Sequence, residues 1–341
     1  MTAQEWSDPG CFPVAPGVHR IPLSMPNDGL HAVNVYAIET ATGLVLIDGG
    51  WRVASAVSEL DDALGLIGRA AHEITDVFVT HVHRDHYTFA VELRRRHGST
   101  VHLGTHERPS LEGIGKLNSN VPESSLRELG RSGAPELAAA VEHVAAGEPF
   151  EPGDWEMPDA WLTDQPINLG DRTLQVVPTP GHTKGHVVFH DLKNGLVFSG
   201  DHVLPTITPS IGFELGQWDL PLGHYLDSLD LLLERPDARL LPAHGDPTSS
   251  IHSRVSDLLE HHRLRLADTG EAVSAASGPV TALYVAERLG WTRRNRHFTE
   301  LNDFNRMIAT CETIAHLDLL VARGTLAVMS RDGVDQFRPA Y

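Results

Sequence analysis

The chain of 341 residues contains only two cysteines, Cys11 and Cys311, and they lie near its opposite ends. This spacing excludes a disulfide framework or a paired-cysteine zinc site, and it favours a reducing compartment. No apolar run reaches the roughly 20 residues that span a bilayer, and residues 1–16 lack the basic start and apolar core of a signal peptide. We therefore expect a cytoplasmic protein without a membrane partner.

Basic residues are also few. The chain has 27 Lys and Arg against 45 Asp and Glu, which gives a formal net charge of −18. Such a chain repels phosphate backbones unless a local basic patch compensates, so nucleic acid is not an expected partner and a small molecule is the expected substrate. The one basic cluster is Arg293-Arg294-Asn295-Arg296-His297. The length suits one large domain and a smaller one.

Histidine, by contrast, is abundant, with 21 residues, and three of them fall in the stretch Thr80-His81-Val82-His83-Arg84-Asp85-His86. This stretch follows the apolar run 76–79, so the pattern predicts a buried strand that leads into a loop. His81 and His83 alternate and therefore face the same way in an extended segment. Asp85 and His86 follow a turn and could serve a second ion beside the first.

The same design recurs three times downstream, where a short apolar run ends in a polar residue. Residues 176–182 end in His182, residues 195–201 end in Asp201, and residues 239–245 contain His244. Histidine clusters arise by chance in a histidine-rich chain, but repetition at strand ends argues for a common site. Imidazole and carboxylate together suit Zn²⁺ best, with Fe or Mn as alternatives.

This H-x-H-x-D-H motif with its three later strand ends resembles the metallo-β-lactamase fold superfamily of metallohydrolases, over most of 18–245. The resemblance implies an α/β fold, a four-layer αββα sandwich, in a domain of residues 1–248. It also implies a pair of divalent ions. One ion would be held by His81, His83 and His182, the other by Asp85, His86 and His244, and Asp201 would bridge both.

Four residues have further roles by this resemblance or by their position. Asp48 follows a third strand and would orient the ligands, and Asp85 would accept a proton from the attacking water. His202 follows Asp201 and could bind a substrate or a ligand carboxylate, although a structural role is about equally open. Tyr87 stands where most relatives have a small glycine-rich step, so it would narrow one wall of the pocket.

Two parts of the chain exceed a minimal fold of this kind. The insertion 104–166 carries two predicted helices, 122–129 and 135–146, and we expect it to form a cap that shapes the substrate pocket. Residues 249–341 form a second expected domain, with a long helix over 251–268 on which His262 is expected to face solvent. Further helices and a terminal hairpin resemble a winged-helix appendage, which would serve packing or homodimerisation.

The expected chemistry is hydrolysis. Two dications can lower the pKa of a shared water from 15.7 to about 7 and so supply a bridging hydroxide. Asp201 replaces the cysteine of one antibiotic-hydrolysing subgroup and resembles instead hydroxyacylglutathione hydrolases, lactonases, thioesterases and nucleases. We expect a small thioester such as an acyl-CoA, an ester or a lactone as substrate. Two alternatives remain, a metal-dependent endoribonuclease or phosphodiesterase and a silent binding module, but the complete set of seven ligands argues against the latter.

Overall fold

The computed structural model describes residues 5–26, 28–117, 120–121, 123–147, 150–212, 218–292 and 295–340. It divides into two compact units. Unit 1 comprises Met1–Lys116, Glu151–Pro209 and Ser228–Val255, and unit 2 comprises Leu117–Phe150, Ser210–Asp227 and Ser256–Tyr341. Arg293 and Arg294 of the basic cluster and Pro122 at the start of a predicted helix lie outside the described residues.

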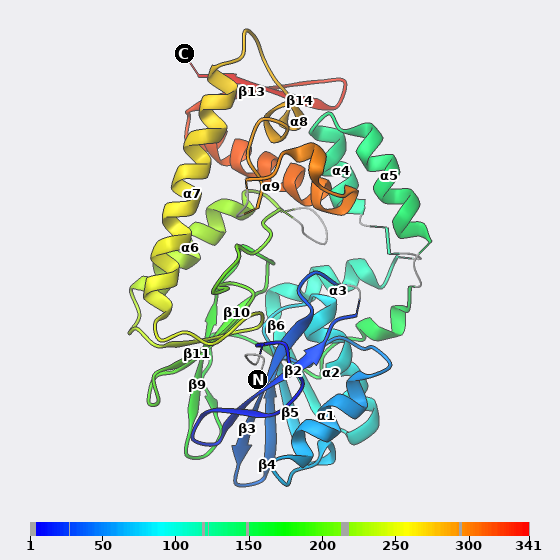
Figure 1. Ribbon diagram of the computed structural model, residues 1–341, viewed down its shortest axis with the longest axis vertical. Coiled ribbons are helices and arrows are strands. Elements are labelled where there is room, and N and C mark those ends of the chain that lie inside the picture. Colours follow the sequence, from blue (N-terminus) through cyan, green and yellow to red (C-terminus); the bar gives the residue numbers. More distant parts are fainter. Residues whose placement is uncertain are drawn as a thin grey trace. The chain divides into compact units, whose positions relative to one another are not determined.

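The first sheet of unit 1 has seven strands in sequential order. Its strands β2 to β6 are coloured from blue to cyan in Figure 1. Its first four strands pair antiparallel, and β4 to β7 pair parallel. The strands are β1 (Phe12–Ala15), β2 (Val18–Ser24), β3 (Ala32–Thr40), β4 (Gly43–Ile47), β5 (Ile74–Val79), β6 (Thr100–Gly104) and β7 (Ala160–Leu162).

The second sheet has the order β12-β11-β10-β9-β8. Its strands β8 to β11 pair antiparallel, whereas β11 and β12 run parallel. The strands are β8 (Ile167–Asn168), β9 (Thr173–Pro178), β10 (Val187–Asp191), β11 (Leu196–Gly200) and β12 (Arg239–Pro242).

The two sheets pack face to face, because alternate residues of their strands join one apolar core. Within this core the rings of Tyr36 and Phe198 meet edge to face at 5.3 Å, and those of Phe78 and Phe189 lie 6.1 Å apart. The buried members from both sheets are Val18, Tyr36, Ile38, Val45, Ile47, Phe78, Leu162, Leu174, Val176, Val187, Phe189, Leu196, Phe198 and Leu241.

Helices cover the outer faces. Helix α1 (Ala56–Gly65) packs on β2, and α2 (Arg84–His97) packs on β5 and β6. The outward residues of the second sheet are buried as well, as expected for a sheet covered on both sides. Unit 1 also includes the 3-10 helices η1 (Ala71–Glu73), η2 (Thr105–Glu107) and η3 (Pro152–Trp155), helix α3 (Arg108–Ile114), the second half of α6 (Pro221–Leu233) and the first turn of α7 (Ile251–Ser274). The predicted αββα fold is confirmed.

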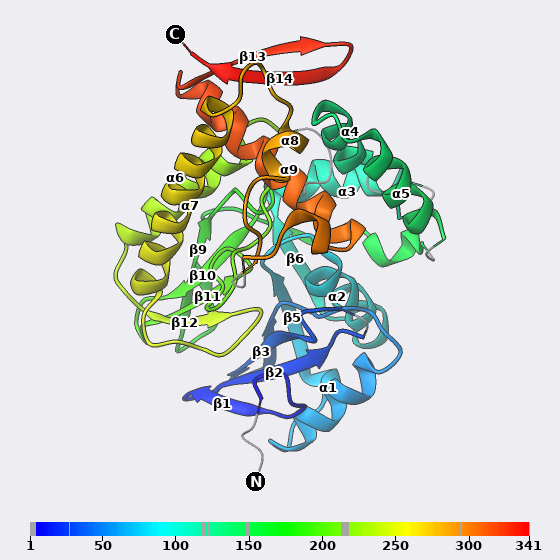
Figure 2. The same ribbon diagram turned by 45° about the horizontal axis from the view of Figure 1, so that its top comes forward.

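Unit 2 is mainly helical (Figure 2). Its helices α4 (Glu123–Arg131) and α5 (Pro135–Ala146) pack on α9 (Asp303–Ala322), and their buried core residues are Leu129, Ala134, Val141, Met307 and Cys311. The unit also contains α8 (Ala282–Ala286), η4 (Phe298–Glu300) and the hairpin β13 (Leu326–Arg331) and β14 (Val334–Pro339). Helices α4 and α5 of the insertion thus share a compact unit with the C-terminal segment, and the winged-helix resemblance stays a prediction.

The expectation for His262 was wrong. Its side chain is fully buried in unit 2, where its ring stacks on His316 at 5.4 Å and its Nδ1 lies 3.2 Å from Nε2 of that residue. The reason is that α7 and α9 bury these faces in one unit, a contact that helical periodicity in α7 alone does not show. Among the described residues, no helix is both long enough and apolar enough to cross a membrane.

Candidate metal centre

Strand direction brings the candidate residues to one edge of unit 1. Strands β4, β5 and β6 are parallel, so their carboxyl ends, followed by Asp48, His81 and Glu107, lie at the same edge of the first sheet. In the second sheet β9, β11 and β12 point one way, and they are followed by His182, Asp201 and His244. Side chains at such carboxyl ends are where ligands bind in open α/β sheets.

The first motif divides between a turn and a helix. His81, Val82 and His83 link β5 to α2, and His83 is the extended N-cap residue of that helix. Asp85 and His86 therefore lie in the first helical turn rather than in a loop, because α2 begins at Arg84. A carboxylate at this end is stabilised by the helix dipole.

All seven predicted ligands come together, in two groups that agree with the expected division. His81, His83, His182 and Asp201 offer ligand atoms that lie within 4.8 Å of one another, and so do Asp85, His86 and His244. His182 Nε2 lies 3.0 Å from His83 Nδ1 in the first group. In the second, His244 Nε2 lies 3.3 Å and His86 Nε2 3.6 Å from Asp85 Oδ2.

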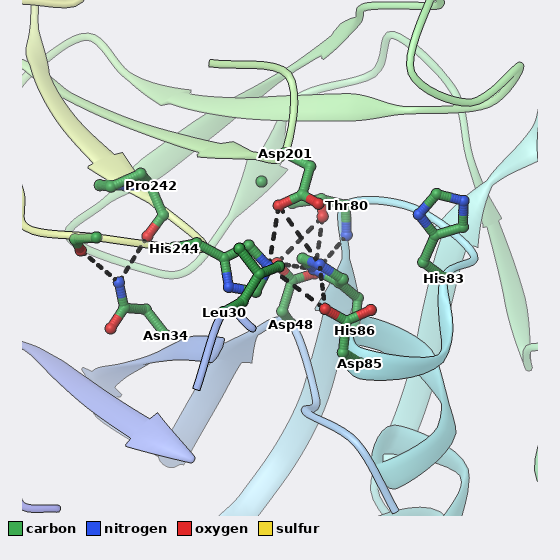
Figure 3. A network of polar contacts seen from close by, with 12 residues as sticks. Leu30, Asn34, Asp48, Thr80, His83, Asp85, His86, Asp201, Pro242 and His244 are labelled. Carbon is green, nitrogen blue, oxygen red and sulfur yellow. Dashed lines mark hydrogen bonds and ion pairs between the residues drawn. The ribbon is translucent and has the colours of Figure 1, made fainter. Parts of the chain in front are cut away.

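Asp201 lies between the groups and faces each with a different oxygen. Figure 3 shows its contacts with His86 and His244 of the second group. Its Oδ1 is 3.6 Å from His86 Nε2 and 3.4 Å from His244 Nε2. Its Oδ2 is 3.5 Å from His182 Nε2. A carboxylate placed in this way can bridge two cations.

The other ring nitrogens of three imidazoles are held by neighbouring acceptors. His86 Nδ1 donates to Asp48 Oδ2 at 3.0 Å, and His244 Nδ1 donates to the carbonyl of Ala32 at 2.8 Å. Thr80 Oγ1 donates to Asp48, so it accepts from His81 Nδ1 at 3.1 Å. Because Nδ1 carries the proton in each ring, Nε2 presents its lone pair, as a metal ligand must.

The electrostatics of the cluster favour cations. Burial and the imidazoles of His86 and His83 lower the pKa of His81 well below its usual value, and burial and His182 lower the pKa of His83 to about 3. Burial alone would lower the pKa of His86 too, but Asp85, Asp48 and Asp201 raise it well above its usual value. Three carboxylates thus create a negative field at His86, while His81 and His83 stay neutral.

The residues fit divalent metal ions on a second, independent ground. Buried polar atoms normally have hydrogen-bond partners. Yet Nε2 of His81, His86 and His244 and Oδ1 of Asp201 are buried without one among the described residues. Imidazole nitrogens and carboxylate oxygens of this kind are the ligands that Zn²⁺, Fe and Mn accept in proteins.

The remaining predicted residues occupy different places. Asp48 is buried at a positive φ of 62° and accepts from Thr80 and His86, which matches its expected position. His202 is buried with its ring 5.6 Å from that of His186. Tyr87 is also buried, and its hydroxyl donates to the carbonyl of Glu156 while its ring stacks on Trp155.

Sequence reasoning missed two residues beside the cluster. His186 stacks on His81 with 5.0 Å between ring centres, and Glu107 is completely buried behind the ligand loops. His186 follows His182 by four residues in a turn that carried only one expected ligand. Glu107 lies three residues after the end of β6, at the end of η2, so a search of the residues just beyond each strand end could have found it.

A two-sheet αββα sandwich with a histidine and aspartate cluster at one edge defines a class of metallohydrolases. The family description "Metallo-beta-lactamase superfamily" matches residues 28–244, which is more than half of the chain. The chain therefore belongs to this superfamily.

Known relatives are distant. The chain is 24% identical over 311 residues to "Probable metallo-hydrolase YqjP" of Bacillus subtilis, covering 85% of this chain and 88% of the relative. It is 24% identical over 261 residues to "Lactamase-like protein adaB" of Aspergillus niger, covering 76% of this chain but only 65% of the relative. The crystal structure of a metallo-beta-lactamase family protein from Thermus thermophilus superposes with a TM-score of 0.75 at 25% identity, over 96% of this chain and 100% of that one.

Proposed function

We propose that the protein hydrolyses a small thioester, such as an acyl-CoA, or an ester or lactone, with two divalent metal ions, Zn²⁺ in the first place and Fe or Mn as alternatives. The position of Asp201 carries this proposal, because one oxygen faces the first ligand group and the other faces the second. An aspartate bridge is the feature that sets this site apart from antibiotic-hydrolysing relatives with cysteine at this position.

Each ion would have its own set of ligands. One ion would be held by His81, His83 and His182, and the other would be held by Asp85, His86 and His244. Asp201 would bind both ions. When bound, the ions would acidify a water molecule and polarise the substrate carbonyl.

Asp85 would accept the proton from the attacking water. Its side chain keeps 12% of its surface exposed and that of Asp201 keeps 11%, whereas the side chains of His86 and His244 are almost completely covered. Together with His83, which is only half-buried, the two carboxylates form the open side of the cluster, where a substrate can approach. Hydrogen bonds from Thr80 and His86 to Asp48 fix the ligands behind them.

The proposed preference for a small molecule over a polyanion rests on the net charge of the chain. A formal net charge of −18 disfavours a polyanionic backbone as substrate and leaves a small molecule as the proposed partner. A screen over acyl-CoA thioesters, esters, lactones, phosphodiesters and RNA, on metal-loaded protein at two salt concentrations, tests this. We expect turnover of a carbonyl substrate with little salt dependence. Turnover of RNA or of phosphodiesters alone would refute the substrate class.

The ligand assignment is tested separately. Asp201→Ala and His83→Ala should lower the metal content measured by mass spectrometry and abolish turnover together. His102→Ala is the matched control, because His102 pairs with Asp76 at 2.8 Å on β6 and belongs to neither ligand group. Full metal content with full turnover in either site variant would show that the assigned ligand set is wrong.

A further inference from the structure

Glu107 is a buried carboxyl group that the proposed chemistry does not use. It ends the 3-10 helix η2 directly after β6, and none of its surface is exposed. Burying a carboxyl group is costly unless hydrogen-bond donors surround it, so its partners indicate what it does.

Those partners come from two ligand loops. The Thr183 hydroxyl donates a hydrogen bond to Glu107 Oε1, and the backbone N–H groups of Val82 and Gly185 interact with the same carboxyl group. Val82 lies between His81 and His83, and Thr183 directly follows His182. The partners of this one side chain therefore flank all three histidines of the first ligand group.

The backbone is built for this close approach. A Cβ atom at Gly185 would lie 2.3 Å from the backbone nitrogen of Glu107 and 2.6 Å from its Cγ. A Cβ atom at Gly104 would lie 2.1 Å from the carbonyl oxygen of Gly185. Only glycine lets the loop after His182 lie directly on the end of β6. A backbone hydrogen bond of 2.9 Å from Val187 to the carbonyl of Thr80 joins the same two loops.

We propose that Glu107 is a positioning residue, whose carboxyl group ties the loop of His81 and His83 to the loop of His182 and so holds the first metal-binding group in its geometry. This inference rests on the proposed metal centre. Glu107 does not contact a ligand atom in this role. Its carboxyl group contacts Val82, Thr183 and Gly185, which belong to the two loops that carry the histidine ligands. Residues that orient ligands in this way typically contribute a factor of about 10–100 to metal affinity.

The test uses the full chain and measures Zn²⁺ affinity by competition with a chromophoric chelator. We expect Glu107→Ala to weaken one of the two ions about 10–100-fold and to change the other much less. Thr183→Val should weaken the same ion, and Thr183→Ser, which keeps the hydroxyl, should restore it. In the Glu107→Ala background, Thr183→Val should add little, because the shared hydrogen bond is already lost.

The absorption spectrum of the Co²⁺-loaded protein provides a readout of ligand geometry that does not depend on turnover. Glu107→Gln has nearly the same shape as the wild-type side chain and keeps an acceptor oxygen. It is the variant to measure if Glu107→Ala does not fold. Asp191→Asn is the control, because Asp191 is an equally buried carboxylate on β10 that pairs with Arg172. It should lower the melting temperature and leave both metal affinities and the Co²⁺ spectrum unchanged.

The outcomes separate the inference from the proposed function. If wild-type protein binds two ions and the Glu107→Ala and Thr183→Val variants bind both ions equally well, the inference alone is overturned. The inference would also be overturned if Asp191→Asn and Glu107→Ala had the same melting temperature and lost the same metal affinity. The loss would then come from general destabilisation of the protein. Wild-type protein that binds no metal would overturn the proposed function and the inference with it.

Discussion

Asp48→Asn is a sharp test of how the second ligand group is oriented. Asp48 accepts from the Thr80 backbone at 2.8 Å, the Thr80 hydroxyl at 2.9 Å and His86 Nδ1 at 3.0 Å. Asparagine has the same shape and tolerates the positive φ of 62° at this position, so the substitution changes only one oxygen to an amide nitrogen.

The size of the effect follows from these contacts. With its oxygen toward Thr80, the new side chain keeps two hydrogen bonds and turns its NH₂ group toward His86. The lost bond is one between a charged acceptor and a buried ring, worth about 1.5–3 kcal/mol of unfolding free energy. His86 is then free to move its proton to Nε2, which blocks the ligand nitrogen. We expect one ion to bind about 10–100-fold more weakly.

Urea unfolding and chelator competition measure the two effects on the same preparation. Asp76→Asn is the matched control, because Asp76 also accepts from a histidine, His102, at 2.8 Å, but on β5 and β6 away from the ligands. It should change neither metal affinity. If Asp48→Asn bound both ions like the wild type and unfolded at the same urea concentration, the orienting role of Asp48 would be refuted.

Two further predictions concern the core and the pH dependence of unit 2. Phe198→Ala removes a ring from the centre of the sheet interface and should cost about 3–5 kcal/mol in urea unfolding, with Phe198→Leu costing clearly less; equal small losses would place Phe198 outside a tight core. Burial and His316 lower the pKa of His262 well below its usual value, and burial lowers the pKa of His316 to about 3. The unfolded chain protonates both near pH 6.5, so it binds more protons, and the stability they contribute is complete above that pH and falls as the pH drops toward 3. Burial raises the pKa of Glu312, which offsets part of this loss. His316→Leu should therefore flatten the decline in unfolding free energy between pH 7 and pH 5, where wild-type protein loses up to about 1.4 kcal/mol per pH unit and histidine; unchanged slopes would contradict it.

The strand ends that carry the seven candidate ligands could be read from the order of amino acids alone. Apolar runs and turns are local signals, so the run 76–79 predicted most of β5, and proline and glycine placed α5 at Pro135–Ala146. Each candidate ligand follows such a strand, and strand ends can be read locally. Strand direction then brings these residues together, because parallel strands end at the same edge of a sheet.

Tertiary packing was needed to show which residues stand behind the ligands and which faces are covered. Glu107 and Thr183 lie 76 positions apart, and His262 and His316 lie 54 apart. Neither contact can be predicted from a periodic pattern in the sequence, because burial of a side chain depends on the second surface that packs against it. The same reason explains why α4 and α5 share a unit with α9: the apolar face of a helix shows that it needs a partner, and only packing selects which partner it finds.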